Sequence, residues 1–202
     1  MSKTQIPTGG IADNAISEEH LDATAITGST ELAAEPATTD ELLLSDAGTL
    51  KRMDFVHIMN RPAFHVYLSS NQSIGNASNT KVLWDSERFD SGGVFASNKF
   101  TVPSDGAGVY VFHYWGKMAQ LDQNESLQIY LYKNNSEWNS QETRHKDLSP
   151  DTGGNEIHVH GSYIGDLAAD DYIEVYVNHN EGASQNLMEE SSGFLGFRLT
   201  GA

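Results

Sequence analysis

Residues 63–201 consist of short runs in which apolar and polar side chains alternate, separated by clusters of Asn, Asp, Gly and Ser. In the run at 63–70, Phe64, Val66 and Leu68 share one face, while His65 and Tyr67 share the other. Alternation with a period of two is typical of half-buried β-strands. The same pattern predicts further strands at 109–116, 126–134, 155–165, 171–179 and 193–201.

Strands at this spacing, with no helical period between them, indicate an all-β sandwich, jelly roll or barrel. The run at 109–116, VYVFHYWG, carries large residues on both of its faces. One face can serve the core of the chain itself, so the other needs a second apolar surface, most simply a neighbouring subunit. We therefore expect this domain to form oligomers.

The first fifty residues have a different composition. All 19 aromatic residues lie from Phe55 onward, and residues 1–50 carry nine acids and one base, which is -8 of the formal net charge of -16. Because aromatic side chains bury the largest apolar areas, this segment is not expected to build a core alone. We predict an extended anchoring arm at 1–40, a β-hairpin connector at 41–60 and a globular domain at 61–202.

The arm contains an apolar residue at every fifth position, a spacing that fits neither a strand nor one face of a helix. A short helix is indicated at Ser17, because acids follow this N-cap residue directly. Two interpretations remain open for the series, a tail with chance spacing or an arm that becomes ordered against a partner. On the second interpretation the anchoring residues are Ile6, Ile11, Ile16, Leu21 and Ile26, together with Leu42, Leu43 and Leu44 of the connector.

The connector itself predicts a β-hairpin. Residues 41–45 and 49–53 flank Asp46, Ala47 and Gly48, and Gly48 suits a left-handed turn position. A single hairpin is marginally stable in water, so this one also needs neighbours.

Composition excludes several classes of function. Without cysteine there is no disulfide framework, no Cys-ligated metal and no thiol nucleophile. A net charge of -16 argues against binding to nucleic acid or to anionic membranes. No run approaches the roughly 20 apolar residues of a membrane helix. The first ten residues lack the apolar core of a signal peptide. We therefore expect a protein that needs no oxidising compartment.

The globular part resembles the C1q/TNF-like jelly roll. The resemblance covers residues 63–202 and is carried by aromatic residues that lead to Gly108-Val109-Tyr110-Val111-Phe112-His113-Tyr114. Weaker matches are Val82-Leu83-Trp84-Asp85, Asp171-Tyr172-Ile173-Glu174-Val175 and Phe194-Leu195-Gly196-Phe197. The resemblance implies an antiparallel jelly-roll sandwich that forms a homotrimer, with Tyr110, Phe112 and Tyr114 at the trimer interface.

Residues 1–58 are similar to adaptor segments of bacteriophage appendage proteins. The match lies in GGIADNAISEEHLDATAITG and, more strongly, in ELAAEPATTDELLLSDAGTLKRMDFVHI. It implies that residues 1–58 dock onto other structural proteins of a virion. The chain has no collagen-like Gly-X-Y stalk of the kind found in some C1q-like proteins.

Metal binding is a minor alternative to a purely structural role. His158 and His160 stand two apart on a predicted strand, so their rings share a face and can supply two ligands. His113, His145 and His179 are candidates for a third metal ligand. Calcium could bind at 149–156 or 166–171, although neither stretch has EF-hand spacing. We predict no cofactor.

Catalytic motifs are absent: the sequence has no GxSxG, HExxH or P-loop. Trp84, Trp115 and Trp138 could stack on sugar rings, but each suits a core or an interface equally well. The Asn-x-Ser/Thr sequons at Asn71, Asn76, Asn124 and Asn134 follow from a surface rich in Asn and Ser. We predict that the protein is not an enzyme.

These observations predict a trimeric bacteriophage protein on the virion surface, as a tail fibre that adheres to a host polysaccharide or protein receptor, or as a capsid decoration. The alternatives are a soluble C1q-like lectin or ligand-binding module outside a virus and, third, a carbohydrate-active enzyme.

Overall fold

The structure is a computed structural model that describes residues 27–59, 61–149 and 155–201. The chain divides into two compact units, and the boundary between them in the sequence lies between His57 and Ile58. The first contains β1 (Glu41–Asp46) and β2 (Thr49–Asp54), and the short helix α2 (Val56–Met59) includes the boundary. The helix predicted at Ser17 lies outside the described residues.

The connector forms the predicted hairpin. β1 and β2 pair in antiparallel register from Glu41 opposite Asp54 to Asp46 opposite Thr49. Only Ala47 and Gly48 form the loop, with φ of 48° and 83°, so both residues take the left-handed conformation. A two-residue loop of this kind matches the right-handed twist of the flanking strands, which explains why Asp46, expected in the loop, extends the strand instead.

The second unit, which we call the knob, is an antiparallel β-sandwich of two seven-stranded sheets in the described residues. Sheet I contains β3 (Ala63–Tyr67), β4 (Gln72–Ile74), β6 (Ser86–Ser91), β9 (Gly108–Leu121), β13 (Asn155–Leu167), β15 (Gln185–Leu187) and β16 (Gly193–Gly201). Sheet II contains β5 (Thr80–Lys81), β7 (Phe95–Ala96), β8 (Lys99–Thr101), β10 (Ser126–Lys133), β11 (Ser136–Glu137), β12 (His145–Leu148) and β14 (Tyr172–His179). The helix α3 (Ser140–Thr143) lies between β11 and β12 in the chain.

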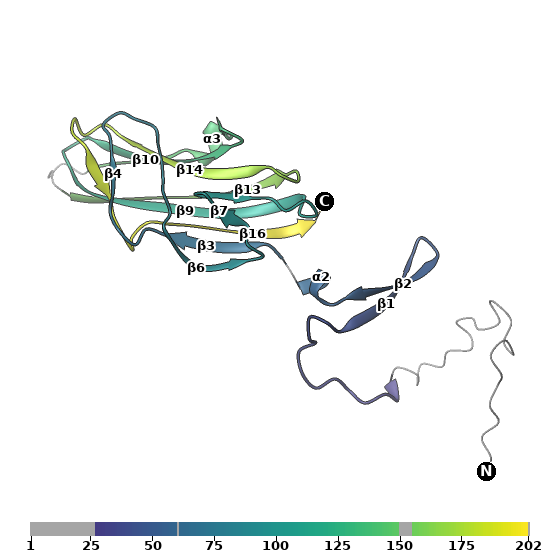
Figure 1. The fold of residues 1–202 in the computed structure, drawn as a ribbon. Helices are drawn as coiled ribbons and strands as arrows, with labels where there is room; N and C mark the ends of the chain where they lie inside the picture. The colour runs from purple at the N-terminus through teal and green to yellow at the C-terminus, as the bar shows by residue number, and fades with distance from the viewer. Residues whose placement is uncertain (1–26, 60, 150–154, 202) are drawn as a thin grey trace, which may run out of the picture. The chain divides into compact units, whose positions relative to one another are not determined.

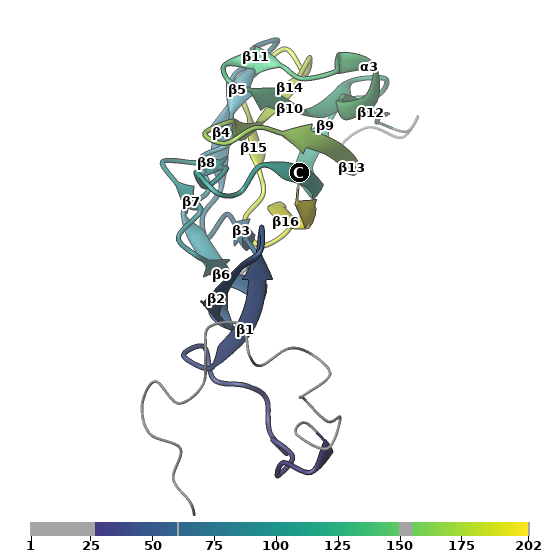
Figure 2. The same ribbon diagram turned by 90° about the vertical axis from the view of Figure 1, so that its right-hand side faces the viewer.

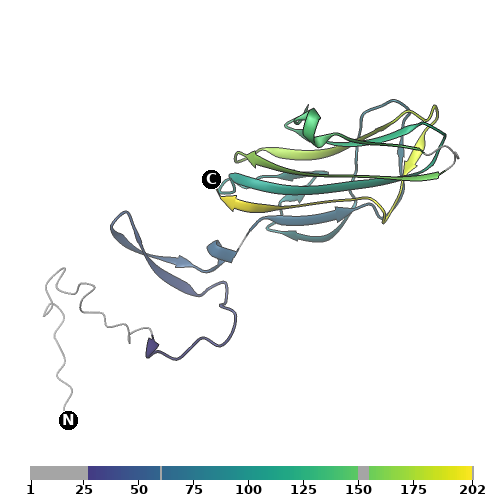
Figure 3. The same cartoon turned by 180° about the vertical axis from the view of Figure 1, so that it is seen from behind.

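The connections are those of a jelly roll. From β8 onward the long strands alternate between the sheets: β9 joins sheet I, β10 sheet II, β13 sheet I, β14 sheet II and β16 sheet I. The last strand, β16, pairs with β3 on one side and β9 on the other. Figures 1 and 3 show β9, β13, β14 and β16 running along the knob, and Figure 2 shows β10, β11 and β14 opposite β3, β6 and β16. The predicted fold class, an all-β antiparallel jelly-roll sandwich, is confirmed.

The two longest strands extend beyond the ranges that alternation predicts. β9 continues from Trp115 to Leu121, and β13 pairs with it over most of its length, with Ile157 opposite Met118. This cross-strand ladder holds the end of β9, where Met118 and Leu121 are buried, in the sheet.

The core lies between the two sheets and is largely aromatic on the side of sheet I. Phe64 of β3 stacks on Phe100 with ring centroids 5.1 Å apart, and it meets Phe194 of β16 edge-on at 4.8 Å. Sheet II contributes the inner faces of β10 and β14, which bury Leu127, Ile129, Leu131, Ile173, Val175 and Val177. Burial of this area supplies most of the stabilisation of the knob.

Candidate functional site

The outer face of sheet I, away from the core, exposes apolar side chains on adjacent strands. Ala63 of β3, Phe197 of β16, Val111 of β9 and Ile164 of β13 stand opposite one another across four strands. Ile164 is 60 % exposed and Phe197 is 42 % exposed. Directly opposed residues in antiparallel strands share a face, so these four side chains form one apolar row.

Two further rows complete this surface. The second consists of His65, Leu195, His113 and Ser162, and Phe89 of β6 joins it beside His65 with 53 % of its surface exposed. The third consists of Tyr67, Gly193, Trp115 and His160. We call the three rows and Phe89 together the uncovered face.

Trp115 lies flat across the neighbouring strand at Gly193. A Cβ atom at Gly193 would stand 2.4 Å from the Trp115 ring, so only glycine allows this approach. The Trp115 indole contacts both histidine rings of the second row. The ring centroid of Trp115 lies 5.7 Å from that of His65 and 5.3 Å from that of His113. The second and third rows therefore form a continuous aromatic surface on the solvent side of the sheet.

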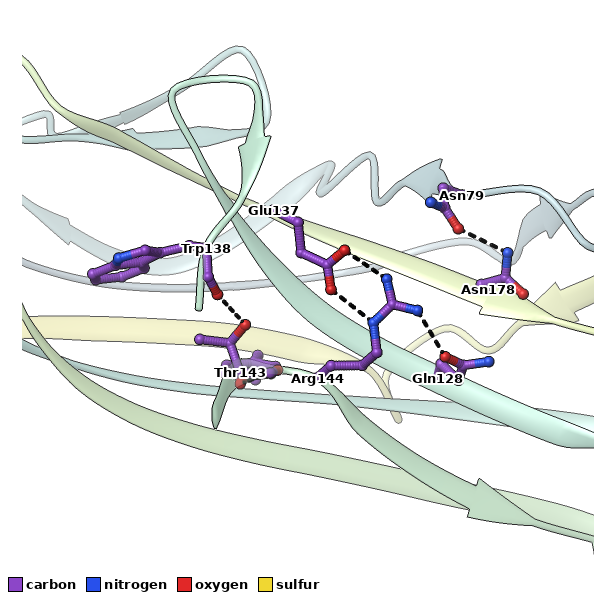
Figure 4. A network of polar contacts seen from close by, with 8 residues as sticks. Asn79, Gln128, Glu137, Trp138, Thr143, Arg144 and Asn178 are labelled. Carbon is purple, nitrogen blue, oxygen red and sulfur yellow. Dashed lines mark hydrogen bonds and ion pairs between the residues drawn. The ribbon is translucent and has the colours of Figure 1, made fainter. Parts of the chain in front are cut away.

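The outer face of sheet II is different, because its aromatic residues are covered by paired polar groups. Tyr132 and Tyr176 stack with centroids 4.0 Å apart. The Arg144 guanidinium lies 4.2 Å over the Tyr130 ring and donates hydrogen bonds to Glu137 and Gln128, at 2.7 and 3.0 Å (Figure 4).

This covering extends across sheet II. Asn178 donates to Asn79 at 2.8 Å (Figure 4), and Lys81 forms an ion pair with Glu174 at 2.6 Å. By contrast, none of the ion pairs in the described residues lies within the uncovered face; Lys117–Glu156 lies beyond its third row, on β9 and β13. A contiguous apolar surface without paired charges is typical of a protein interface. The uncovered face is the candidate functional site.

The prediction that Tyr110, Phe112 and Tyr114 form the trimer interface is wrong about the face of the strand. All three side chains are fully buried within one chain. The Tyr110 hydroxyl donates to the Gly106 carbonyl at 2.7 Å, and the Tyr114 hydroxyl donates to the Thr143 carbonyl at 2.6 Å. Burial raises the pKa of both phenols, which stay neutral and bonded inside the sandwich.

The residues of this strand that can reach a neighbouring chain are its odd-numbered ones, from Val109 to Trp115. The sequence shows that both faces of this strand are apolar, but it does not show which face packs in the core and which faces a neighbouring chain. Sequence reasoning missed Ile164, Leu195 and Phe197 entirely. The available signal was the alternation in the later strands, which becomes informative only when the register with β9 is known.

The histidines proposed as metal ligands do not form a ligand set. His158 and His160 are exposed on one face of β13, as predicted. Together with His145 and Asp147 they line a hollow of about 170 Å³. However, the described part of the chain contains no group of three or more His, Cys, Asp or Glu side chains placed to hold a metal. His179 is fully buried and bonded to the Ile74 carbonyl at 3.0 Å.

The two acidic stretches considered for calcium have different outcomes. Most of the first, residues 150–154, lies outside the described residues. In the second, Asp171 accepts hydrogen bonds from Asn134 at 2.6 Å and the Ala168 amide at 2.9 Å, and it pairs with Lys133 at 2.7 Å. Its carboxylate is engaged by protein groups.

Of the three tryptophans, Trp115 alone belongs to the uncovered face. Trp84 is 6 % exposed, and Trp138 packs against the core beside Tyr163 with centroids 4.7 Å apart. The asparagines of three sequons accept backbone hydrogen bonds: Asn71 from Glu189, Asn76 from Gly182 and Asn134 from Tyr172, at 2.8 to 2.9 Å. The fourth, Asn124, has a φ of 65°.

The predicted anchoring residues are described only in the hairpin. Leu43 is 72 % exposed, Leu42 is 43 % exposed and Leu44 is half-buried. Ile6, Ile11, Ile16, Leu21 and Ile26 lie outside the described residues. In the part of the chain that the structure covers, no helix has the length and apolar character to span a membrane.

Proteins similar to this chain are found among solved structures. No protein-family model matches the sequence, and no curated protein sequence does. Among solved structures, the globular domain of zebrafish complement 1qA is 18 % identical, with a TM-score of 0.49, and the match covers 70 % of this chain and 99 % of that one. Murine APRIL is 14 % identical, with a TM-score of 0.49, covering 68 % and 97 %. An Eiger TNF from S. frugiperda is 16 % identical, with a TM-score of 0.47, covering 71 % and 95 %.

At TM-scores below 0.5 these likenesses carry no argument about function. The jelly-roll assignment rests on the strand order and the alternation of strands between the sheets.

Proposed function

We propose that this chain is a non-enzymatic structural protein of a bacteriophage virion and a homotrimer on the virion surface. The observation that supports the assembly is the uncovered face, where Val111, Ile164, Leu195 and Phe197 point away from the core. In a closed symmetric assembly each chain presents the same patch to its neighbours, so one apolar face per chain is sufficient.

Threefold closure is favoured by the resemblance of residues 63–202 to trimeric C1q/TNF-like jelly rolls. The trimer interface is proposed on the outer face of sheet I. Sheet II then faces outward, where its paired charges are compatible with solvent.

Residues 1–58 are proposed to anchor the trimer to other structural proteins of the virion. The similarity to phage adaptor segments supports this role, and so do the exposed side chains of Leu42 and Leu43. A two-stranded hairpin is marginal by itself in water, so a partner surface that buries these leucines would also stabilise the hairpin. The knob would be displayed outward, as a short fibre that binds a host polysaccharide or protein receptor, or as a decoration that reinforces the capsid.

Deleting residues 1–58 is expected to abolish incorporation into virions while leaving the melting temperature of the knob nearly unchanged, because the knob contains its own core. The copy number per particle is measured on purified virions by quantitative mass spectrometry. Within the intact chain, Leu43→Asp is expected to reduce incorporation strongly, whereas Leu148→Asp, at a position of the knob that is 53 % exposed and outside the anchoring segment, serves as the matched control. Truncated protein present at normal copy number contradicts the anchoring role.

Particles that lack the protein separate adhesion from capsid reinforcement. Residues 58–202, the knob, carry 18 acids and 9 bases, so the knob is repelled by anionic polysaccharide. Repulsion between exposed charges is screened beyond about 10 Å at 0.1 M salt and almost fully at several tenths molar. An adhesin is therefore expected to support stronger adsorption to cells as salt increases. A capsid decoration predicts normal adsorption of knob-less particles and earlier release of the genome on heating. Knob-less particles that behave normally in both assays refute both roles.

A further inference from the structure

The uncovered face carries an unusual share of the histidines of this chain. Of eight histidines in the sequence, His65, His113 and His160 lie in its second and third rows. His158 follows on the same face of β13, opposite Lys117. Histidine is the side chain whose ordinary pKa lies close to physiological pH, so histidines at an interface can make its assembly depend on pH.

His65 and His113 occupy central positions on this surface. Both lie in the same row, on either side of Leu195 in β16, and both rings contact the Trp115 indole. His65 also meets the Phe89 ring edge-on at 6.2 Å. An assembly that buries Leu195 and Trp115 therefore buries these two imidazoles as well.

The charged groups around His65 do not favour its protonated form. β6 presents Arg88, whose guanidinium lies 4.8 Å over the Tyr67 ring, while Glu87 stands opposite Val66, the next residue of β3. β16 contributes Leu195, and β9 contributes Trp115 and His113. Burial, followed by the positive charge of Arg88, already lowers the pKa of His65 in the single chain.

Around His113 the facing strand β13 contributes two anions, Asp166 and Glu156, towards the two ends of the strand pair. β13 places Ser162 opposite His113, with His160 and Ile164 as the diagonal neighbours and Asp166 one pair beyond Ile164. β9 itself adds Lys117, which pairs with Glu156 at 2.6 Å. A proton on His113 thus has no carboxylate directly opposite or diagonal to it in its own chain.

We infer that the uncovered face is a pH-dependent interface, which joins three copies of the chain when His65 and His113 are neutral and releases them when these residues are protonated. This inference rests on the proposed trimer. In a closed threefold assembly each imidazole occurs three times around one axis. Protonation there places like charges in an apolar contact from which water is excluded, and such unpaired buried charges are strongly unfavourable.

The direction and the size of the effect follow from linkage. A histidine whose pKa is lower in the assembly than in the separate chain contributes its full stabilisation above its pKa in the separate chain and loses it as the pH falls below that pKa. When the pH falls by one unit below this pKa, protonation of one such histidine weakens association about tenfold. Since the histidine occurs once in each of three chains, the trimer association constant then decreases about a thousandfold. If both His65 and His113 must remain neutral, the upper bound is about a millionfold.

The net charge of the chain predicts the opposite trend. With -16 per chain at pH 7 and a pI near 4.6, acidification reduces the repulsion between three acidic chains. Charge alone would therefore strengthen the trimer between pH 7.5 and pH 5.5. Dissociation over this range distinguishes the interface histidines from the bulk charge.

The test is sedimentation velocity of the full chain at pH 7.5 and pH 5.5, at constant ionic strength and over a range of concentrations. We expect a trimer at pH 7.5 and, at pH 5.5, a trimer association constant that is lower by up to about a thousandfold for one histidine per chain, with near-UV circular dichroism of a folded knob. The double variant His65→Gln/His113→Gln removes the titrating groups and is expected to show little pH dependence. His57→Gln, at an exposed position in α2, is the matched control and should behave like the wild type.

The outcomes distinguish failure of the pH-dependent interface from failure of the trimer itself. A wild-type trimer that is equally strong or stronger at pH 5.5 overturns the pH-dependent interface and leaves the trimer intact. A monomer at pH 7.5 overturns the trimer and this inference with it. If the double variant does not assemble at pH 7.5, His65→Gln and His113→Gln are measured singly, and each must reduce the slope of the association constant against pH. Slopes unchanged from the wild type in both variants refute the inference.

Discussion

Val111→Asp is expected to convert the proposed trimer into a folded monomer. Val111 lies in the centre of the apolar row of the uncovered face, between Phe197 and Ile164, and points away from the core. In the assembly the substitution introduces three carboxylates into adjoining apolar contacts, and an uncompensated buried charge costs about 3–5 kcal/mol. Sedimentation equilibrium of the full chain at pH 7.5 measures the loss of association, and thermal unfolding of the monomer shows whether the knob remains intact.

Leu148→Asp is the matched control for this variant. Leu148 is 53 % exposed on β12, at the edge of sheet II, so the same apolar-to-acid change falls outside the proposed interface. It is expected to leave the trimer unchanged. Equal dissociation by both variants would mean that added negative charge, and not the uncovered face, controls assembly.

Tyr110→Asp is expected to unfold the knob, although Tyr110 is the immediate neighbour of Val111. Its side chain is fully buried, and its ring lies 5.2 Å from Phe100 and 6.1 Å from Phe112. The substitution removes these contacts and places a carboxylate in the core. The combined loss exceeds about 4 kcal/mol, a large part of the roughly 5–15 kcal/mol that stabilises a domain. Far-UV circular dichroism and urea unfolding at low protein concentration measure the effect.

Tyr110→Phe keeps the ring and removes only the hydrogen bond to the Gly106 carbonyl. It is expected to destabilise the knob by about 1 kcal/mol without changing the oligomeric state. The contrast between positions 110 and 111 tests the assignment of the two faces of β9. A folded, monomeric Tyr110→Asp protein would place Tyr110 at the interface after all.

The alternation of residues was sufficient to predict most of the strands. The runs at 63–70, 126–134, 171–179 and 193–201 correspond to β3, β10, β14 and β16. The hairpin at 41–54 was also predictable, because Gly48 follows a short polar turn between two strand-forming runs. These features are local, since side chains of a strand alternate and tight turns need particular residues regardless of the rest of the chain.

The candidate site was not predictable to the same extent. The strand at its centre was identified from VYVFHYWG, but the interface was assigned to Tyr110, Phe112 and Tyr114 when the structure buries all three. Val111 and His113, on the opposite face of the same strand, look no more exposed in the sequence than their neighbours. Ile164 and Phe197 could not be linked to Val111 at all, because they are 53 and 86 positions away in the chain.

The amino-acid sequence by itself determined the fold class of this protein, the contrast between an aromatic-free acidic arm and an aromatic knob, and the need of one strand for apolar contacts on two faces. Only the tertiary structure decided which face of that strand is internal. That choice depends on which residues of β3, β13 and β16 stand opposite those of β9, and a shift of register by one residue would exchange the two faces. Such pairings join distant parts of the chain through packing, which no local pattern encodes.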